Sequence, residues 1–276
     1  MPSLPFRLRR NPAARGEYPL GRREPTDFEH VEKYPYSAVA PRAVAHAERV
    51  LRLPWWHWGH DQGKEGSCVG HGISMERAIT NIAQAKALGL LNPGRRYNPL
   101  DVWNEAKKID EWPDTNPGDD HGTSVRAGYD VCRDKGLVRV ISMRMGPDGV
   151  PVPYRPKPRS KDEGVQRNRW AGSTDEVRTA IASGLPVAIG VNWYSNFDRP
   201  VAKPSPDGGF DHWIGEGDLG RVRGGHSVCI YGASDARQAF KVKNSWGRDY
   251  PLVWIPYTSM ERLVDEHGEV AIVTDR

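Results

Sequence analysis

The stretch from Gln62 to Cys68 reads QGKEGSC and stands immediately before the longest helical pattern in the chain. Apolar residues recur at three- and four-residue spacing over 75–91, which predicts a helix that begins near Ser67. A cysteine at a helix start meets partial positive charge and free amides, which favour a thiolate and stabilise an oxyanion. Gln62 stands upstream, where its side-chain amide can join the backbone N–H of Cys68 as a second oxyanion donor.

Two motifs farther along the chain supply a histidine and an asparagine. Residues Gly225–Val228 read GHSV and lead into a predicted strand, and Asn244–Gly247 read NSWG after the next predicted strand. An asparagine oxygen that accepts from an imidazole fixes its tautomer, and a tryptophan can cover that bond from water. If the two strands pair as a hairpin, His226 and Asn244 meet. Taken singly, a buried cysteine or a lone histidine is more often structural.

Taken together, the three motifs resemble those of the papain-like cysteine peptidases, which carry Q-G-x-x-G-S-C, G-H-A-V and N-S-W-G in this order. The resemblance covers about residues 54–257 and is nearest to bacterial and phage-type members. It implies that Cys68 is the nucleophile, His226 its base and acid, Asn244 the orienting residue and Gln62 the oxyanion donor. It also implies peptide hydrolysis through a thioester, with no metal or organic cofactor.

Two positions depart from the secreted members of that family. Glu65 stands where those enzymes carry a disulfide cysteine, and Val69 replaces the aromatic residue that follows the nucleophile. The chain has three cysteines, an odd number without framework spacing, which suits a reducing compartment. We therefore expect an intracellular, disulfide-free protein, with altered packing beside the thiol but every catalytic atom retained.

The order of predicted elements indicates an α+β protein with the papain-like arrangement of two lobes. Helical patterns cover 67–91, 98–109 and 124–135, whereas strand patterns dominate the second half at 186–193, 227–231, 239–243, 252–255 and 270–273. We expect a helical lobe at 51–145 that carries the nucleophile, and a β-rich, barrel-like lobe at 146–276 that carries the histidine and asparagine. The active-site cleft would lie between them. Residues 146–169 lack either periodicity and are predicted to form a linker or surface loop.

Residues 1–50 form a predicted N-terminal extension that is poor in aliphatic residues and has six arginines against one acid before residue 24. The simplest interpretation is a solvated arm on the surface, with an anionic partner or a short pro-segment as alternatives. Because the extension is short beside the family's inhibitory pro-segments, zymogen control is not expected. The long segment 195–225 ends at the histidine and is a candidate for shaping the cleft.

Composition excludes several classes of protein. The 276 residues are 38% hydrophobic and 27% charged, which supports a folded core. A net charge of +4 is too small to indicate nucleic-acid binding. The sequence has no long apolar run and no signal-peptide pattern, so neither membrane insertion nor export is expected. We predict a cytoplasmic or virion-associated protein that acts on protein or peptide substrates.

Three alternatives stay open. His57, His60, Cys68 and His71 have residue types and spacing that can bind zinc. A papain-like fold can also serve as a catalytically silent binding or structural component, for example of a virus particle. A thiol acyltransferase would form the same acyl-enzyme and pass it to an amine instead of water.

Overall fold

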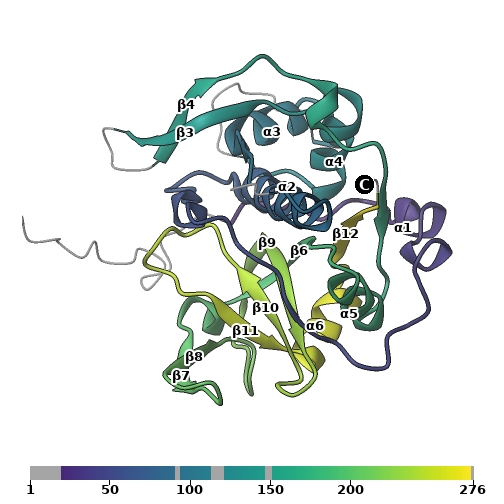
Figure 1. Ribbon diagram of the computed structural model, residues 1–276, viewed down its shortest axis with the longest axis vertical. Coiled ribbons are helices and arrows are strands. Elements are labelled where there is room, and N and C mark those ends of the chain that lie inside the picture. The colour runs from purple at the N-terminus through teal and green to yellow at the C-terminus, as the bar shows by residue number, and fades with distance from the viewer. Residues whose placement is uncertain (1–19, 91–93, 113–120, 147–150, 275–276) are drawn as a thin grey trace, which may run out of the picture.

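The computed structural model describes residues 20–90, 94–112, 121–146 and 151–274 (Figure 1). Its helices are α1 (Glu29–Lys33), α2 (Cys68–Ala87), α3 (Pro99–Ala106), α4 (Val125–Asp134), α5 (Thr174–Ala182) and α6 (Tyr257–Asp265). Its first strands are β1 (Glu48–Val50), β2 (Arg96–Tyr97), β3 (Arg139–Met145), β4 (Pro151–Pro156), β5 (Asn168–Trp170) and β6 (Val187–Tyr194). The remaining strands are β7 (Val201–Pro204), β8 (Phe210–Trp213), β9 (Val222–Ser234), β10 (Ala239–Lys243), β11 (Val253–Pro256) and β12 (Glu269–Val273).

Nine of the described strands form one sheet, in the order β5-β12-β6-β9-β10-β11-β8-β7, with β1 also paired to β9. All of its pairs are antiparallel except β11 with β8. Figure 1 shows α2, α3 and α4 on one side of this sheet, together with the β3–β4 hairpin, and α5 and α6 on the other. The helices of the first half of the chain thus pack against the β-rich second half, with α2 on β9.

Local sequence sets where the helices begin. The Asn98 side chain accepts hydrogen bonds from two backbone amides of α3, and a proline occupies the first turn of that helix. Ser124 and Ser173 cap α4 and α5 in the same way, each through its hydroxyl oxygen. The starts of α3 and α4 agree with the predicted ones because capping depends on side chains that are close in sequence.

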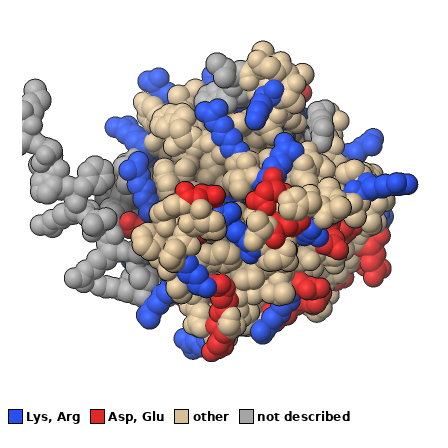
Figure 2. Space-filling view, turned by 60° about the horizontal axis from the view of Figure 1, so that its bottom comes forward, with Lys and Arg blue, Asp and Glu red and all other residues tan. Residues whose placement is uncertain are grey.

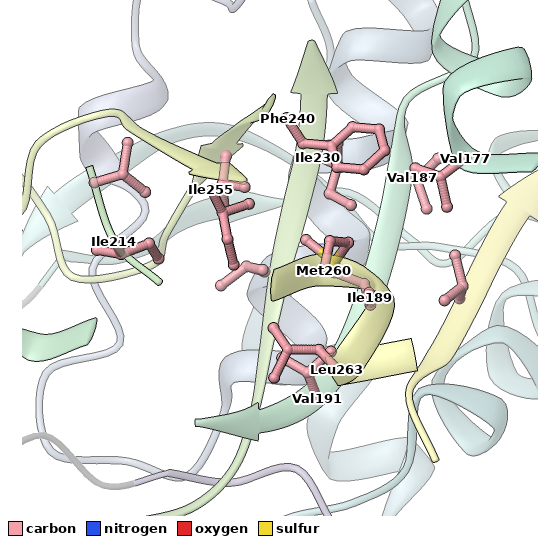
Figure 3. Close-up of a cluster of buried hydrophobic side chains, with 14 of the residues drawn as sticks. Val177, Val187, Ile189, Val191, Ile214, Ile230, Phe240, Ile255, Met260 and Leu263 are labelled. Carbon is pink, nitrogen blue, oxygen red and sulfur yellow. The ribbon is translucent and has the colours of Figure 1, made fainter. Parts of the chain in front are cut away.

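The larger hydrophobic core lies between the sheet and helices α5 and α6 (Figure 3). Strand side chains from β6, β9 and β10 meet helix side chains there, including Val187, Ile189, Ile230, Phe240, Val177, Met260 and Leu263. A second cluster joins α2 and α4 to the opposite face of the sheet and includes Cys68 itself. The nucleophile candidate is therefore anchored in the packing between the helices and the sheet.

The α+β class is confirmed, but the predicted linker at 146–169 is wrong. Strand β4 lies there and pairs with β3, which also pairs with β2, and β5 joins the large sheet. Strand β4 is an edge strand with several prolines, a position where a missing backbone N–H is tolerated. Its prolines hide the strand periodicity. The segment 195–225 likewise contains a β7–β8 hairpin.

Charged side chains of both signs are interspersed on the face seen in Figure 2. This mixture agrees with the small net charge of the chain. None of the helices in the described part of the chain has the length and apolar character needed to cross a membrane.

Candidate active site

Helix α2 places Cys68 at its first residue, with Ser67 as the preceding cap. The thiol is fully buried. It receives hydrogen bonds from the backbone amides of Gly21, Ser227 and Val69. Since Ser227 follows His226 on β9, these contacts join the start of the helix to the strand that carries the histidine.

His226 and Asn244 are brought together by the pairing of β9 with β10. The distance from His226 Nε2 to Asn244 Oδ1 is 2.8 Å, and the backbone N–H of Ser245 donates to the same oxygen at 2.6 Å. A carbonyl oxygen only accepts, so Nε2 carries the proton of the neutral imidazole. Nδ1 is then the basic nitrogen, and it is buried with no hydrogen-bond partner among the described residues.

Two tryptophans enclose the imidazole. The rings of Trp193 and Trp246 have centroids 4.7 Å and 5.0 Å from that of His226. Trp193 Nε1 donates to Asp198 at 3.0 Å, which fixes that indole. The bond between His226 and Asn244 is consequently shielded from water, and a hydrogen bond in a low-dielectric setting is stronger.

Gln62 is tied to the loop that holds Asn244. Its backbone N–H donates to the Ser245 carbonyl at 2.9 Å, and the Ser245 hydroxyl donates to Gln62 Oε1 at 2.6 Å. Gln62 Nε2 donates to the Glu65 carbonyl at 2.8 Å. The structure therefore places Gln62 beside the asparagine loop, with its amide nitrogen bonded within the loop that precedes Cys68.

Burial controls protonation in this conformation. Loss of solvent raises the pKa of the Cys68 thiol to about 11, against the lowering effect of its backbone hydrogen bonds. Loss of solvent also lowers the pKa of His226 to about 4, although the bond to Asn244 opposes this shift. The pair is thus a neutral thiol and a neutral imidazole near pH 7. The expected preference of the helix N-terminus for a thiolate is outweighed by desolvation.

The segment Leu20–Arg23 lies against the thiol and runs between Thr123 and Gly225, with a backbone bridge to each. The Arg22 amide donates to the Gly225 carbonyl at 3.0 Å, and the Arg23 amide donates to the Thr123 carbonyl at 2.9 Å. Thr123 in turn donates to the Gly21 carbonyl at 2.9 Å. The prediction of a surface arm is wrong for these residues, because backbone pairing on both sides buries Gly21 and Arg22. Residues 1–19 of the predicted extension lie outside the described residues.

The alternative zinc ligands have other partners. His60 Nδ1 lies 3.2 Å from His71 Nδ1, and His57 Nδ1 bonds to the Pro54 carbonyl at 2.8 Å. In the ranges that the structure describes, no three His, Cys, Asp or Glu side chains gather in a way that could hold a metal ion. The four residues whose spacing suggested a zinc site in the sequence therefore do not form a cluster of metal ligands.

Comparison with known proteins identifies the fold. No family model matches the chain. It is 24% identical over 250 residues to an uncharacterized peptidase C1-like protein of Acanthamoeba polyphaga mimivirus, covering 82% of this chain and 74% of that protein. The crystal structure of xylellain, a cysteine protease from Xylella fastidiosa, superposes with a TM-score of 0.61 at 16% identity over 94% of this chain and 97% of that one. Digestive procathepsin L 3 of Tenebrio molitor gives 0.55 at 13% identity over 87% and 73%.

The chain has the papain-like fold of the C1-type cysteine proteases. This confirms the resemblance and the α+β arrangement expected from the sequence. The nearness to bacterial and phage-type members stays a prediction.

Three further residues that pack beside the site were not singled out from the sequence. Arg22 was counted only as one charge of a basic arm, and Gly190 lies inside a strand pattern. Glu269 is the one charged residue in the otherwise apolar strand β12, and it is fully buried. A charge in a strand that reads EVAIV was the available signal, since buried charges need a partner.

Proposed function

We propose that this chain is a cysteine peptidase in which Cys68 and His226 perform peptide hydrolysis and Asn244 orients the imidazole. The observation that supports this most directly is the 2.8 Å bond from His226 Nε2 to Asn244 Oδ1. That bond leaves Nδ1 as the basic nitrogen on a ring whose strand neighbour, Ser227, donates to the thiol. A base fixed by a third group beside a nucleophile is the arrangement that covalent catalysis requires.

The reaction proceeds through an acyl-enzyme. As the sulfur of Cys68 bonds to the peptide carbonyl carbon, its proton passes to His226 Nδ1. The C–N bond then breaks, and His226 returns the proton to the departing amine. Water attacks the thioester, which releases the carboxylic acid and restores the thiol.

The negative charge on the tetrahedral oxygen needs donors. The first amides of α2 have no partner within the helix, and the amide of Cys68 is among them. Gln62 supplies the second donor once its side-chain nitrogen turns from the Glu65 carbonyl toward the cleft. Its tie to Ser245 keeps it at the rim of the site throughout.

The test uses the full chain with Gly21→Ala, because residues 20–23 cover the thiol of the unaltered chain. The reagent is a thiol-reactive epoxysuccinyl peptide, and labelling is read by intact mass and peptide mapping. We expect one label at Cys68, lost in Cys68→Ala and strongly slowed in His226→Ala. Cys132→Ala is the matched control, because that cysteine is equally buried but lies on α4. Equal slow labelling of all three cysteines would overturn the assignment.

Product analysis separates the related activities. Hydrolysis gives a free carboxylic acid whether or not an amine is added, whereas an acyltransferase gives an amide when an amine is present. A catalytically silent binding protein gives neither product. Protein or peptide substrates follow from the proposed reaction, and a location inside a cell or a virus particle is part of the same proposal.

A further inference from the structure

Lys243 is the last residue of β10, and its ammonium group is buried beside the loop that carries Asn244. The residue is only 3% exposed. Its Nζ donates to the Asn244 carbonyl and lies 5.7 Å from the centre of the Trp58 ring. In the described part of the chain no carboxylate lies within ion-pairing distance of this nitrogen, and Asp61 acts on it only from farther away. An ammonium has three N–H donors, so two of them still need an acceptor.

The charge of this group has to be balanced inside the protein. Burial lowers the pKa of Lys243 to about 8, while the Asp61 carboxylate opposes the shift. Near pH 7 most of the molecules therefore keep the charged form. A charge that has left water is stable only with a counter-charge or with hydrogen-bond partners at its polar atoms. The side chains around Lys243 supply only part of this compensation.

A small cavity adjoins the ammonium group, between α2 and the paired strands β9 and β10. Its volume is about 10 Å³, which is room for one water-sized particle. Lys243, Ser227, His60 and His71 give it polar walls, and no Asp or Glu of the described residues lines it. The space beside the buried cation is thus surrounded by groups that can donate hydrogen bonds.

The Ser227 hydroxyl is one of these donors. Its oxygen is buried and has no hydrogen-bond partner in the ranges that the structure describes. A Cβ on Gly72 would come within 2.7 Å of that oxygen, so the side of α2 that faces Ser227 is open only because residue 72 is a glycine. A buried hydroxyl without a partner is costly, and an acceptor in the cavity would remove that cost.

His60 and His71 supply a further donor between them. Their Nδ1 atoms lie 3.2 Å apart, so one ring donates to the other. Burial lowers the pKa of both imidazoles, and the charge of Lys243 is a further cause, so each ring holds one proton near pH 7. The ring that accepts at Nδ1 must carry its proton on Nε2. That N–H is left for an acceptor outside the pair.

We propose that this cavity binds one small monovalent anion of the size of chloride, held by the ammonium of Lys243 and the hydroxyl of Ser227. Water could fill the same space but would leave the charge of Lys243 unbalanced. Because Nζ also donates to the Asn244 carbonyl, the anion would fix the loop of the proposed orienting residue from behind. The site does not depend on the proposed function, and its test needs no turnover.

The test compares the melting temperature of the full chain in sodium chloride and in sodium gluconate at equal ionic strength, since gluconate is too large for the cavity. A ligand that binds only the folded chain raises Tm by mass action. We expect Tm to rise by about 2 °C or more as chloride replaces gluconate up to about 500 mM. Lys243→Met should abolish this rise. Lys241→Met is the matched control, because Lys241 is on the same strand but its ammonium lies 3.6 Å from the Asp211 carboxylate.

Lys243→Met also has an expected stability of its own. Without chloride it should be at least as stable as the unaltered chain, because it removes a buried charge that lacks a partner. Chloride should then favour the unaltered chain relative to this variant. A chloride-specific rise of the same size in Lys243→Met would overturn the site.

A second measurement locates the ion without any change at Lys243. Crystals of the unaltered chain are soaked in sodium bromide, and we expect an anomalous peak in the cavity. Ser227→Ala keeps the backbone amide that contacts the thiol and should weaken the chloride effect at least about threefold. Equal Tm values in chloride and gluconate would overturn the proposal and assign the cavity to water. A bromide peak without a chloride-specific rise in Tm would mean binding at crystal concentration only, and would overturn it as well.

Discussion

Gly21 and Gly66 lie in backbone contact: a Cβ on Gly21 would come within 1.7 Å of the Gly66 carbonyl oxygen. Even an alanine at position 21 must therefore push the segment away from the loop before Cys68. Because this segment covers the thiol, its displacement should let water and reagents in.

We expect Gly21→Ala to speed alkylation of Cys68 by iodoacetamide at least about tenfold, since exposure brings the thiol pKa down from its raised value. The measurement is the rate of mass increase at neutral pH. Gly172→Ala is the control, because a Cβ there meets nothing closer than 3.9 Å. Identical rates in Gly21→Ala and the wild type would show that the segment does not protect the thiol.

Loss of the asparagine should reduce turnover less than loss of the base. In the Gly21→Ala background, His226→Ala removes the acid and base and should lower kcat by about 10²- to 10⁴-fold. Asn244→Ala removes only the acceptor that lies 2.8 Å from His226 Nε2. Its kcat should therefore lie between that of His226→Ala and that of the parent. Asn196→Ala, in the exposed loop, serves as the control. An Asn244→Ala loss equal to that of His226→Ala would mean that the asparagine does more than orient the ring.

His71 should prove dispensable for the chemistry. It lies one turn into α2, but its ring nitrogen faces His60 at 3.2 Å. We expect His71→Asn to keep far more activity than His226→Ala, and a chelator to leave activity unchanged. Peptide hydrolysis and metal analysis of the same preparations check this. Stoichiometric zinc that disappears in His71→Asn would restore the metal interpretation.

Acid should destabilise the fold well above the pH at which carboxylates titrate. Burial lowers the pKa of His226 to about 4 and that of His71 to about 3, so the unfolded chain takes up these protons first as the pH falls below 6.5. The free energy of unfolding should fall by up to about 1.4 kcal/mol per pH unit for each histidine. The free energy of unfolding should be nearly flat between about pH 7.5 and pH 8, below the range in which the thiols of the unfolded chain ionise.

Urea midpoints between about pH 8 and pH 5 measure this slope. His71→Asn should reduce it, because one of the protons is no longer taken up. A midpoint that does not move over this range would contradict the buried, neutral state of the histidines.

The sequence allowed the helix starts and most of the sheet to be predicted, because caps and periodicity are local signals. Asn98 and Ser124 cap the helices that were expected, and the pairing of β9 with β10 brings His226 to Asn244. The β4 strand was missed because its prolines mask an edge strand.

The contact of Arg22 with Glu269 could not be predicted from local sequence patterns, for a different reason. The two residues are 247 positions apart, and neither has a neighbour in sequence that reveals the other. Only the paired backbone of residues 20–23 between Thr123 and Gly225 brings them together. The same long-range closure explains why a helix-start cysteine, expected to be a thiolate, is protonated.

The burial of the Cys68 thiol also affects how readily the protein is damaged by oxidation. Oxidation to sulfenic acid and beyond requires a thiolate that solvent and peroxide can reach. With Cys68 fully buried and its pKa raised, the closed chain should survive storage in air with its sulfur reduced. In Gly21→Ala, where we expect the thiol to be exposed, the same sulfur should be oxidised faster than in the unaltered chain.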